Sequence, residues 1–446
     1  MLKRALDYLV LAAIWMMTPT AASPQEPFRP VPGSGLSDRL TNAVKQADSE
    51  SAGKSFWTAY SFDIRNGVAV NIGRPPAFQG KAELLGGTEV FYGTMNGAPA
   101  TSRVALFSLH PARSESVSRV AIYNLDKQQR PADGYPVYWL GHATKEEALN
   151  DARRLAETGQ STAVRAPATL AVALQDDPRV SEILKNLITK TTDAEVRSIA
   201  IASLGQLKTD SDFLADLASQ DAKAQTQIQA IQSIARDKNG NAFARLRNVY
   251  RPDLQPKVKM ALLNTMADLR DKDAVASFLL EVEQNDPSPE IKQHTIYVLR
   301  LFDGNSTIDE MMRRFHTEPD ESFKNQILYA FSQMNNPRAM EKLFEAARQS
   351  DNPRVRREAR FLIQQTINGR LARELPKGAG GGKEEEQFDD QAERIMKEQS
   401  PEQAVTTFTQ IAKTNPNLRI RLRAIFFLIK LDDPRVLDFY SELLSH

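Results

Sequence analysis

Apolar positions recur with a period near 32 residues from residue 164 onward. In most copies a β-branched or aromatic residue is followed by apolar residues four and eight positions later, which places one apolar stripe on a helix. The copies begin at Val164, Val196, Thr226, Val258, Ile291, Phe323, Val355 and Ile420, in steps of 32, 30, 32, 33, 32, 32 and 65 residues. The pattern predicts a stack of helix pairs, with each copy as the second helix of its pair.

Six helix starts are marked by Asp, Asn or Ser directly before a proline. The side-chain oxygen accepts a hydrogen bond from an unpaired amide of the first turn, and proline lacks the amide that would otherwise have no partner. The dipeptides are Asp177-Pro178, Ser288-Pro289, Asn336-Pro337, Asn352-Pro353, Ser400-Pro401 and Asp433-Pro434. Gln403 is placed to complete a capping box with Ser400. These helix starts therefore rest on a mechanism as well as on propensity.

One copy shows the full motif, with Asp193, Val196, Arg197, Ala200 and Leu204 in a D-x-x-V-R-x-x-A-x-x-x-L arrangement. This arrangement resembles the HEAT repeat, and the short period is similar to that of phycobilisome-lyase-type repeat proteins. The resemblance covers roughly residues 160 to 375 and 387 to 446. It implies an α-α solenoid and a binding scaffold, although a fold does not fix a function.

Seven of the eight copies carry a cation at the second position, namely Arg165, Arg197, Lys259, Lys292, Lys324, Arg356 and Arg421. One interpretation is a basic ladder for an acidic partner. The other is structural, because Asp193 could pair with Arg197, and Asp320 with Lys324, at i, i+4 spacing. That arrangement resembles the polar ladder that holds HEAT pairs in register, and we favour the structural interpretation.

The final step of 65 residues equals about two periods. A weaker copy with an i, i+4, i+8 stripe begins at Phe388, but a glycine-rich and charged segment occupies the place of its first helix. We predict residues 370 to 386 to be a solvated linker. Residues 387 to 446 then either continue one interrupted array or form a separate module. Asp438, Ser441 and Glu442 are expected on the outer, polar face of a last helix that caps the stack.

Residues 55 to 158 have a different period, because side chains alternate from Phe56 onward as in a half-buried strand. Asn66-Gly67 predicts a hairpin with a returning strand at 68–72. Further strands are expected at 89–93, 103–110, 118–125 and 135–140, a long loop at 73–87, and a helix after a capping box of Thr144 and Glu147. We predict a small α+β domain with an antiparallel or mixed sheet.

Aromatic residues of this domain are candidates for a ligand platform, namely Trp57, Tyr60, Tyr138 and Trp139. The alternative is that they form the core of the sheet. The domain resembles no family, so its role stays open.

The N-terminus has the pattern of a signal peptide. Lys3 and Arg4 precede an apolar stretch at 5–17, and small residues end at Ala22. An uncleaved anchor is the alternative. The chain has no cysteine, so no disulfide framework supports it. We expect a bacterial protein exported to the periplasm or envelope, without a stable membrane span after cleavage.

The predicted organisation has six parts. They are a signal peptide at 1–22, a linker with a short helix at 23–54, a β-rich domain at 55–158, a HEAT-like solenoid at 159–369, a linker at 370–386 and C-terminal HEAT-like helices at 387–446.

Motifs for chemistry are scarce. The five histidines form no metal-binding pair, and thiolate zinc sites and a G-x-S-x-G elbow are absent from the sequence. Acidic residues at 384–386 argue against phosphate binding by the preceding glycines. The net charge of +1 argues against a general grip on nucleic acid. We therefore predict no catalytic, cofactor-binding or metal-binding residues and no cofactor.

The preferred hypothesis is an exported, non-enzymatic scaffold that binds a protein or peptide partner on the solenoid surface. The alternative is a lyase-type or other enzyme, or a ligand-handling protein, with its site in the concave groove or on the β-rich domain. Nucleic-acid binding, which the Arg354, Arg356, Arg357 and Arg360 cluster favours weakly, conflicts with export.

Overall fold

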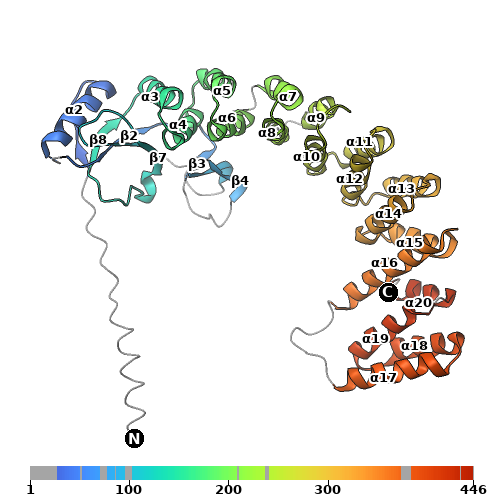
Figure 1. Ribbon diagram of the computed structural model, residues 1–446. Coiled ribbons are helices and arrows are strands. Elements are labelled where there is room, and N and C mark those ends of the chain that lie inside the picture. The colour runs from blue at the N-terminus through green and yellow to red at the C-terminus, as the bar shows by residue number, and fades with distance from the viewer. Residues whose placement is uncertain are drawn as a thin grey trace, which may run out of the picture. The chain divides into compact units, whose positions relative to one another are not determined.

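The computed structural model describes residues 28–50, 53–70, 78–85, 87–95, 103–207, 210–236, 241–372, 383–431 and 433–444 (Figure 1). The predicted signal peptide lies outside these residues. The chain divides into two compact units, residues 1–217 and 218–446, and each is described by itself. None of the described helices combines the length and apolar character required to cross a bilayer.

Two sheets form the β-rich part of the first unit. The five-stranded sheet has the order β1 (Arg29–Pro30), β8 (Val137–His142), β2 (Phe56–Phe62), β6 (Val104–His110) and β7 (Arg119–Asn124). It is mixed, because β8 runs parallel to β1 and β2 while the other pairs are antiparallel. The antiparallel three-stranded sheet has the order β3 (Val68–Val70), β5 (Thr88–Met95) and β4 (Phe78–Leu85). The predicted α+β class is confirmed.

The predicted hairpin at Asn66-Gly67 is wrong. Gly67 does adopt a positive φ of 76°, but β3 pairs with β5 in the second sheet. The reason is that β6 and β8 occupy both edges of β2, so β2 has no free edge for β3. The expected loop at 73–87 contains β4, and the expected linker at 23–54 contains β1, which pairs with β8.

The prediction of a half-buried β2 is also wrong, because both faces of this strand are covered. Trp57 and Ala59 pack against Ala105 and Phe107 on one face. The opposite face lies toward α2 (Leu36–Glu50) and α3 (Lys145–Thr158). The alternation predicted only one covered face, but helices also cover the second face, which carries Thr58 between aromatic residues.

His110 is a buried polar residue of that second face. Its Nε2 atom lies 2.9 Å from Thr58 Oγ1, and its ring stacks on Phe56 with centroids 5.0 Å apart. Burial lowers the pKa of His110 to about 4. The backbone of Glu115 and Ser116 has the opposite but smaller effect, since it favours the charged ring. The ring is therefore neutral at pH 7.

The helices of the first unit form pairs. After α3 come α4 (Thr162–Leu174), α5 (Arg179–Lys190), α6 (Ala194–Leu207) and α7 (Ser211–Gln220), which reaches the boundary between the units. α3 packs against α4, α5 packs against α6, and α4 also contacts α6 and β7. The predicted capping box is confirmed, since the Glu147 amide donates to Thr144 Oγ1 and the Thr144 amide donates to Glu147. α3 was assigned to the β-rich domain, but it packs as the first helix of the first pair.

The second unit continues with helix pairs of the same kind. From its N-terminal end it contains α8 (Ala224–Ile234), α9 (Ala242–Val249), α10 (Pro256–Ala267), α11 (Lys272–Asn285), α12 (Pro289–Leu299), α13 (Asn305–Thr317), α14 (Glu321–Gln333), α15 (Pro337–Gln349) and α16 (Pro353–Ala372). The second helices α8, α10, α12, α14 and α16 contact one another in succession. In α14, for example, Phe323, Ile327 and Phe331 are buried, as their stripe predicts.

The C-terminal helices are α17 (Lys383–Glu398), α18 (Pro401–Thr414), α19 (Leu418–Ile429) and α20 (Pro434–Leu444). α16 packs against α19 and α20, whereas α17 packs against α18 and α19 (Figure 1). The stripe of α17 is buried at Phe388 and Ala392, as expected, but α17 does not take the next place after α16. The capping box of Ser400 and Gln403 is confirmed.

The polar face predicted for α20 is present, because the side chains of Asp438 and Glu442 are 70% and 55% exposed, but the helix lies beside α15, α16 and α18. Asp438 pairs with Arg348 of α15 at 2.8 Å, and Glu442 pairs with Lys413 of α18 at 2.6 Å. The buried residues of α20 explain this position, because they cover more than one side of the helix; they are Val436, Leu437, Phe439 and Tyr440. α20 therefore packs against α15, α16 and α18.

The predicted linker at 370–386 is shorter than expected. α16 extends to Ala372, and α17 already begins at Lys383, so the acidic residues lie in a first helical turn. Negative charge is favourable there because of the helix dipole. Glu385 is buried and accepts from Arg419 at 3.0 Å. Residues 373–382 lie outside the described part of the chain.

A first prediction concerns acid stability. Because the pKa of His110 is lower in the folded state than in the unfolded chain, its contribution is fully present above about pH 6.5 and is lost as the pH falls toward 4. The loss should reach about 3 kcal/mol in the free energy of unfolding. The described tryptophans, Trp57 and Trp139, both lie in the five-stranded sheet, so urea unfolding followed by fluorescence measures this part. In His110→Gln this pH dependence should be reduced; an unchanged profile would contradict the prediction.

A second prediction concerns the position of α20. The chain has no cysteine, so introduced cysteines can be cross-linked without background. In the variant Arg348→Cys/Asp438→Cys, a short bismaleimide should join α15 to α20, and peptide mass spectrometry should find the link. The control pair Arg348→Cys/Glu393→Cys places the second cysteine on an exposed residue of α17, and the reagent should not cross-link these two cysteines. A cross-link from Arg348→Cys to Glu393→Cys, with none to Asp438→Cys, would instead support the hypothesis that the C-terminal helices continue one interrupted array.

Candidate protein-interaction surface

Five of the seven ladder cations bind the C-terminal carbonyls of the first helix in their own pair. The donor–acceptor pairs are Arg165 with Ala156 (3.0 Å), Arg197 with Thr191 (2.8 Å), Lys292 with Gln284 (3.0 Å), Arg356 with Ser350 (2.6 Å) and Arg421 with Ala412 (3.0 Å). The last carbonyls of a helix have no partner within it, and they carry partial negative charge. A cation at the second repeat position therefore caps the neighbouring helix.

The acidic partners predicted for the ladder are wrong. Asp193 accepts from the amides of Glu195 and Val196, at 3.0 and 3.3 Å, and thus caps its own helix. Asp320 likewise accepts from the Ser322 amide, while the Lys324 ammonium lies 5.4 Å from the centroid of the Phe315 ring. An aspartate at a helix start is drawn to the unpaired amides of the first turn.

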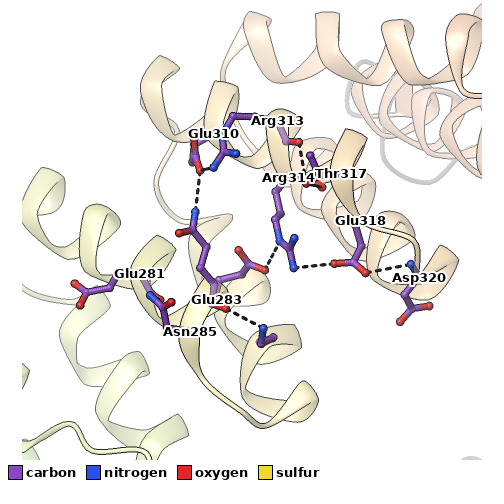
Figure 2. A network of polar contacts seen from close by, with 11 residues as sticks. Glu281, Glu283, Asn285, Glu310, Arg313, Arg314, Thr317, Glu318 and Asp320 are labelled. Atoms are coloured by element: carbon purple, nitrogen blue, oxygen red, sulfur yellow. Dashed lines mark hydrogen bonds and ion pairs between the residues drawn. The ribbon is translucent and has the colours of Figure 1, made fainter.

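Acid–base contacts do tie successive pairs together, but on the first helices. Arg314 of α13 contacts buried Glu283 of α11 at 2.9 Å, and Glu318 at 2.8 Å (Figure 2). Nearby, Glu310 accepts from Gln284 at 3.0 Å and from Arg313. The polar network runs between α11 and α13.

Lys259 is the exception among the ladder cations. Its Nζ atom lies 2.7 Å from Asp286 Oδ2, and the two side chains are 3% and 0% exposed. Asp286 also accepts from the Tyr250 hydroxyl and from the Ser288 amide. Burial alone would raise the pKa of Asp286, but the hydrogen bonds from Lys259 and Tyr250 outweigh burial and keep that pKa below its usual value. The carboxylate therefore stays charged inside the array.

The four candidate ligand aromatics do not form one platform. Successive side chains of a strand point to opposite faces of the sheet. Trp57 and Trp139 therefore lie on one face, and Tyr60 and Tyr138 lie on the other. Trp57 and Tyr138 are buried, and Trp139 stacks on Phe28 with centroids 5.4 Å apart. Tyr60 donates to Asp151 at 3.1 Å and lines a cavity.

A surface that sequence reasoning missed lies on the second helices of the second unit. Four aromatic side chains there are about half exposed, namely Tyr297 (50%), Tyr329 (46%), Phe361 (46%) and Phe426 (49%). They lie on α12, α14, α16 and α19, which contact one another in succession. We call these four residues the aromatic row.

Each member of the aromatic row is the sixth residue after the start of its repeat. On a helix this position points away from the buried stripe, which explains the exposure. The same position holds Leu170, Ala202, Gln232 and Asn264 in the four earlier copies. A comparison of the copies at this position could have found the row, but a search for the apolar stripe passes over it.

Cations accompany the aromatic row. The Arg300 guanidinium lies 4.2 Å from the centroid of the Tyr297 ring, and Arg300 also donates to the Tyr297 hydroxyl at 2.8 Å. The Lys430 ammonium lies 5.0 Å from the Phe426 ring centroid. In these four repeats, the second, sixth, ninth and tenth residues after each start include no Asp or Glu. At these positions the surface is apolar, polar or basic, and the nearest acids on the same helices are Glu290 of α12 and Glu358 of α16.

A third prediction concerns the buried ion pair. Lys259→Met should leave Asp286 as an uncompensated buried charge and lower the free energy of unfolding by about 3–5 kcal/mol. Thermal unfolding followed by circular dichroism measures the loss. The matched control is Lys292→Met, which removes a partly exposed cation bound to a carbonyl and should cost about 1–2 kcal/mol. Equal losses of unfolding free energy in the two variants would show that the buried charge of Asp286 adds nothing to the cost of removing the cation.

Comparison with known proteins agrees with the repeat architecture. A family model described as HEAT repeats matches residues 276–364, which include three members of the aromatic row. No curated protein matches the chain. The described residues also contain no group of three or more His, Asp and Glu side chains that could hold a metal ion. The helix pairs, their period and the match at residues 276–364 together support a HEAT-like repeat family for the helical array.

Proposed function

We propose that this protein is a non-enzymatic scaffold whose aromatic row binds a protein or peptide partner. HEAT repeats are in general protein-interaction scaffolds. The observation that carries the proposal is the repetition of an exposed aromatic residue at one repeat position on four helices in succession. Isolated exposed apolar residues are ordinary, whereas a contiguous set marks an interaction site.

The composition of the row supports a protein partner. Tyrosine and arginine are enriched among the residues that carry most of the binding energy at protein interfaces. Tyr297 with Arg300 combines a large, rigid ring with a bound cation. The helices beneath are buried along their stripes, so the rings are held at positions that the array fixes in advance, and less conformational entropy is lost on binding.

The charge of the surface indicates the chemistry of the partner. Arg300 and Lys430 lie over rings of the row, and Arg357 is exposed one turn before Phe361. A partner segment with apolar side chains beside carboxylates would complement this surface. Binding should weaken as salt increases, because the cations are near the solvent.

The site of action that we propose is outside the cytoplasm, in the periplasm or cell envelope. Support comes from the sequence of residues 1–22, which has a basic start, an apolar stretch and a small-residue end. Fractionation of cells that express the full chain, with mass determination of the mature N-terminus, tests this part.

The scaffold proposal gives a fourth prediction. Tyr329→Ala/Phe361→Ala should lower the affinity for the partner by roughly 30-fold or more, because truncation of one central interface aromatic costs about 2 kcal/mol. The free energy of unfolding should change by less than about 1 kcal/mol, since both side chains are exposed. The measurement is quantitative capture of envelope proteins on the immobilised full chain.

The matched control is Tyr135→Ala, which truncates a similarly exposed aromatic residue (40%) in the first unit. Proteins captured by the unchanged chain and by the control, but lost from the double variant, are partners of the row. If the double variant captures the same proteins in the same amounts, the aromatic row is not the binding surface.

A further inference from the structure

The first unit contains a cavity of about 440 Å³ between two helices and the five-stranded sheet. Its lining comes from α2, α3, β2, β6 and the segment between β6 and β7. We call this space the α2 cavity, and it is independent of the aromatic row. Protein interiors have few voids larger than a water molecule, and this volume falls in the range of small-molecule sites.

One wall of the α2 cavity is apolar. Leu36, Leu40 and Val44 follow each other at helical spacing along α2, and Val117 joins them from the segment between β6 and β7. Leu40 and Val44 are not fully buried by the rest of the protein. An aliphatic group of a ligand could cover this surface and remove it from water.

The floor of the cavity is polar, although it lies where a sheet faces a helix. Thr58, Ser108 and His110 project from neighbouring strands, with Thr58 and Ser108 in register as a cross-strand pair. All three residues are buried. Apolar residues normally fill such an interface, because a buried polar group without a partner is costly.

Two floor groups keep unused hydrogen-bonding capacity. His110 Nδ1 is buried and makes no hydrogen bond of normal geometry among the described residues, although the backbone of Glu115 and Ser116 lies near enough to raise the pKa of the ring. The side chain of Ser108 likewise makes no hydrogen bond to the described part of the chain, and it faces the cavity. A hydroxyl and a neutral imidazole can each donate or accept. The floor therefore offers uncharged groups that a ligand can satisfy.

Of the four charged residues that line the cavity, Glu147, Asp151 and Arg154 are engaged, whereas Glu115 is exposed to solvent. Asp151 accepts from Tyr60 at 3.1 Å and pairs with Arg154 at 2.5 Å. Glu147 accepts from the Leu36 amide at 2.7 Å, which joins the first turn of α2 to α3. An ammonium group would find no free carboxylate on the floor, and a carboxylate would meet Asp151 nearby. Burial keeps the pKa of His110 near 4, so its ring adds no charge at neutral pH.

The geometry points to the α2 cavity as a binding site for a small uncharged molecule that has an aliphatic body and a hydroxyl group. The hydroxyl binds Ser108 and His110 on the floor, and the aliphatic body lies against Leu40 and Val44 of α2. This assignment gives the β-rich domain a role of its own, as a ligand-binding module joined to the repeat array.

Three probes of equal chain length test the chemistry: 1-hexanol, hexylamine and hexanoate. Saturation-transfer NMR with the full chain at neutral pH measures the dissociation constant of each probe. Hexanol should bind with millimolar affinity, and the two charged probes should bind several-fold more weakly. The assignment is overturned if either charged probe binds as well as hexanol, or if hexanol does not bind.

Two variants locate the binding. Ser108→Ala removes one neutral hydrogen bond and should weaken hexanol binding by roughly threefold to tenfold. Leu40→Trp fills the cavity from a partly exposed helix position and should abolish saturable binding. Tyr135→Ala lies outside the cavity lining and serves as the control. Urea unfolding checks that each variant is folded, and an unchanged dissociation constant in both folded cavity variants would place the binding elsewhere.

Discussion

The constraint on which the helical part depends is that no single helix pair can cover its own apolar stripe. Val196, Ala200 and Leu204 are fully buried because α4 and α6 pack against each other as well as against their own partners. The same contacts recur from α8 to α16. Burial of one side of each second helix leaves the opposite side exposed. The residue at the position of the aromatic row can therefore differ between repeats without disturbing the core.

Stacking also creates the need for the repeated polar signature. Each added pair places helix ends beside its neighbours, where their unpaired amides and carbonyls require partners. Aspartates such as Asp193 cap the amides, and cations such as Arg197 cap the carbonyls of the preceding helix. Helix ends therefore explain the recurrent cation in five copies. Acid–base pairing between repeats occurs on other residues, such as Arg314 and Glu283, and on one ladder cation, Lys259, with Asp286.

The β-rich domain obeys a different constraint, set by the central position of β2. Because β6 and β8 pair with both edges of β2 and because both faces are covered, almost every side chain of the strand is buried. Polar residues are costly in such a place unless they are paired. Thr58 pairs with His110, yet Ser108 and His110 Nδ1 keep capacity beside the α2 cavity. This departure from an apolar interface is the reason to assign a ligand there.

The sequence by itself determined the features that depend on residues a few positions apart. The repeat period, the buried stripes, the Asx-Pro helix starts and both capping boxes follow from contacts within a few turns, so local spacing encodes them. Most strands of the β-rich domain were also located. The same spacing encodes the aromatic row, but its significance needs the exposure that only packing sets.

Tertiary structure alone decided the contacts between distant residues. β3 joins the second sheet because the edges of β2 are occupied, and Arg29 lies beside Tyr138 in register. α20 packs between α15 and α18 because its buried residues face two ways and Asp438 meets Arg348. The α2 cavity unites residues from 36 to 154. No local pattern records such neighbours, since their approach depends on how the whole chain packs.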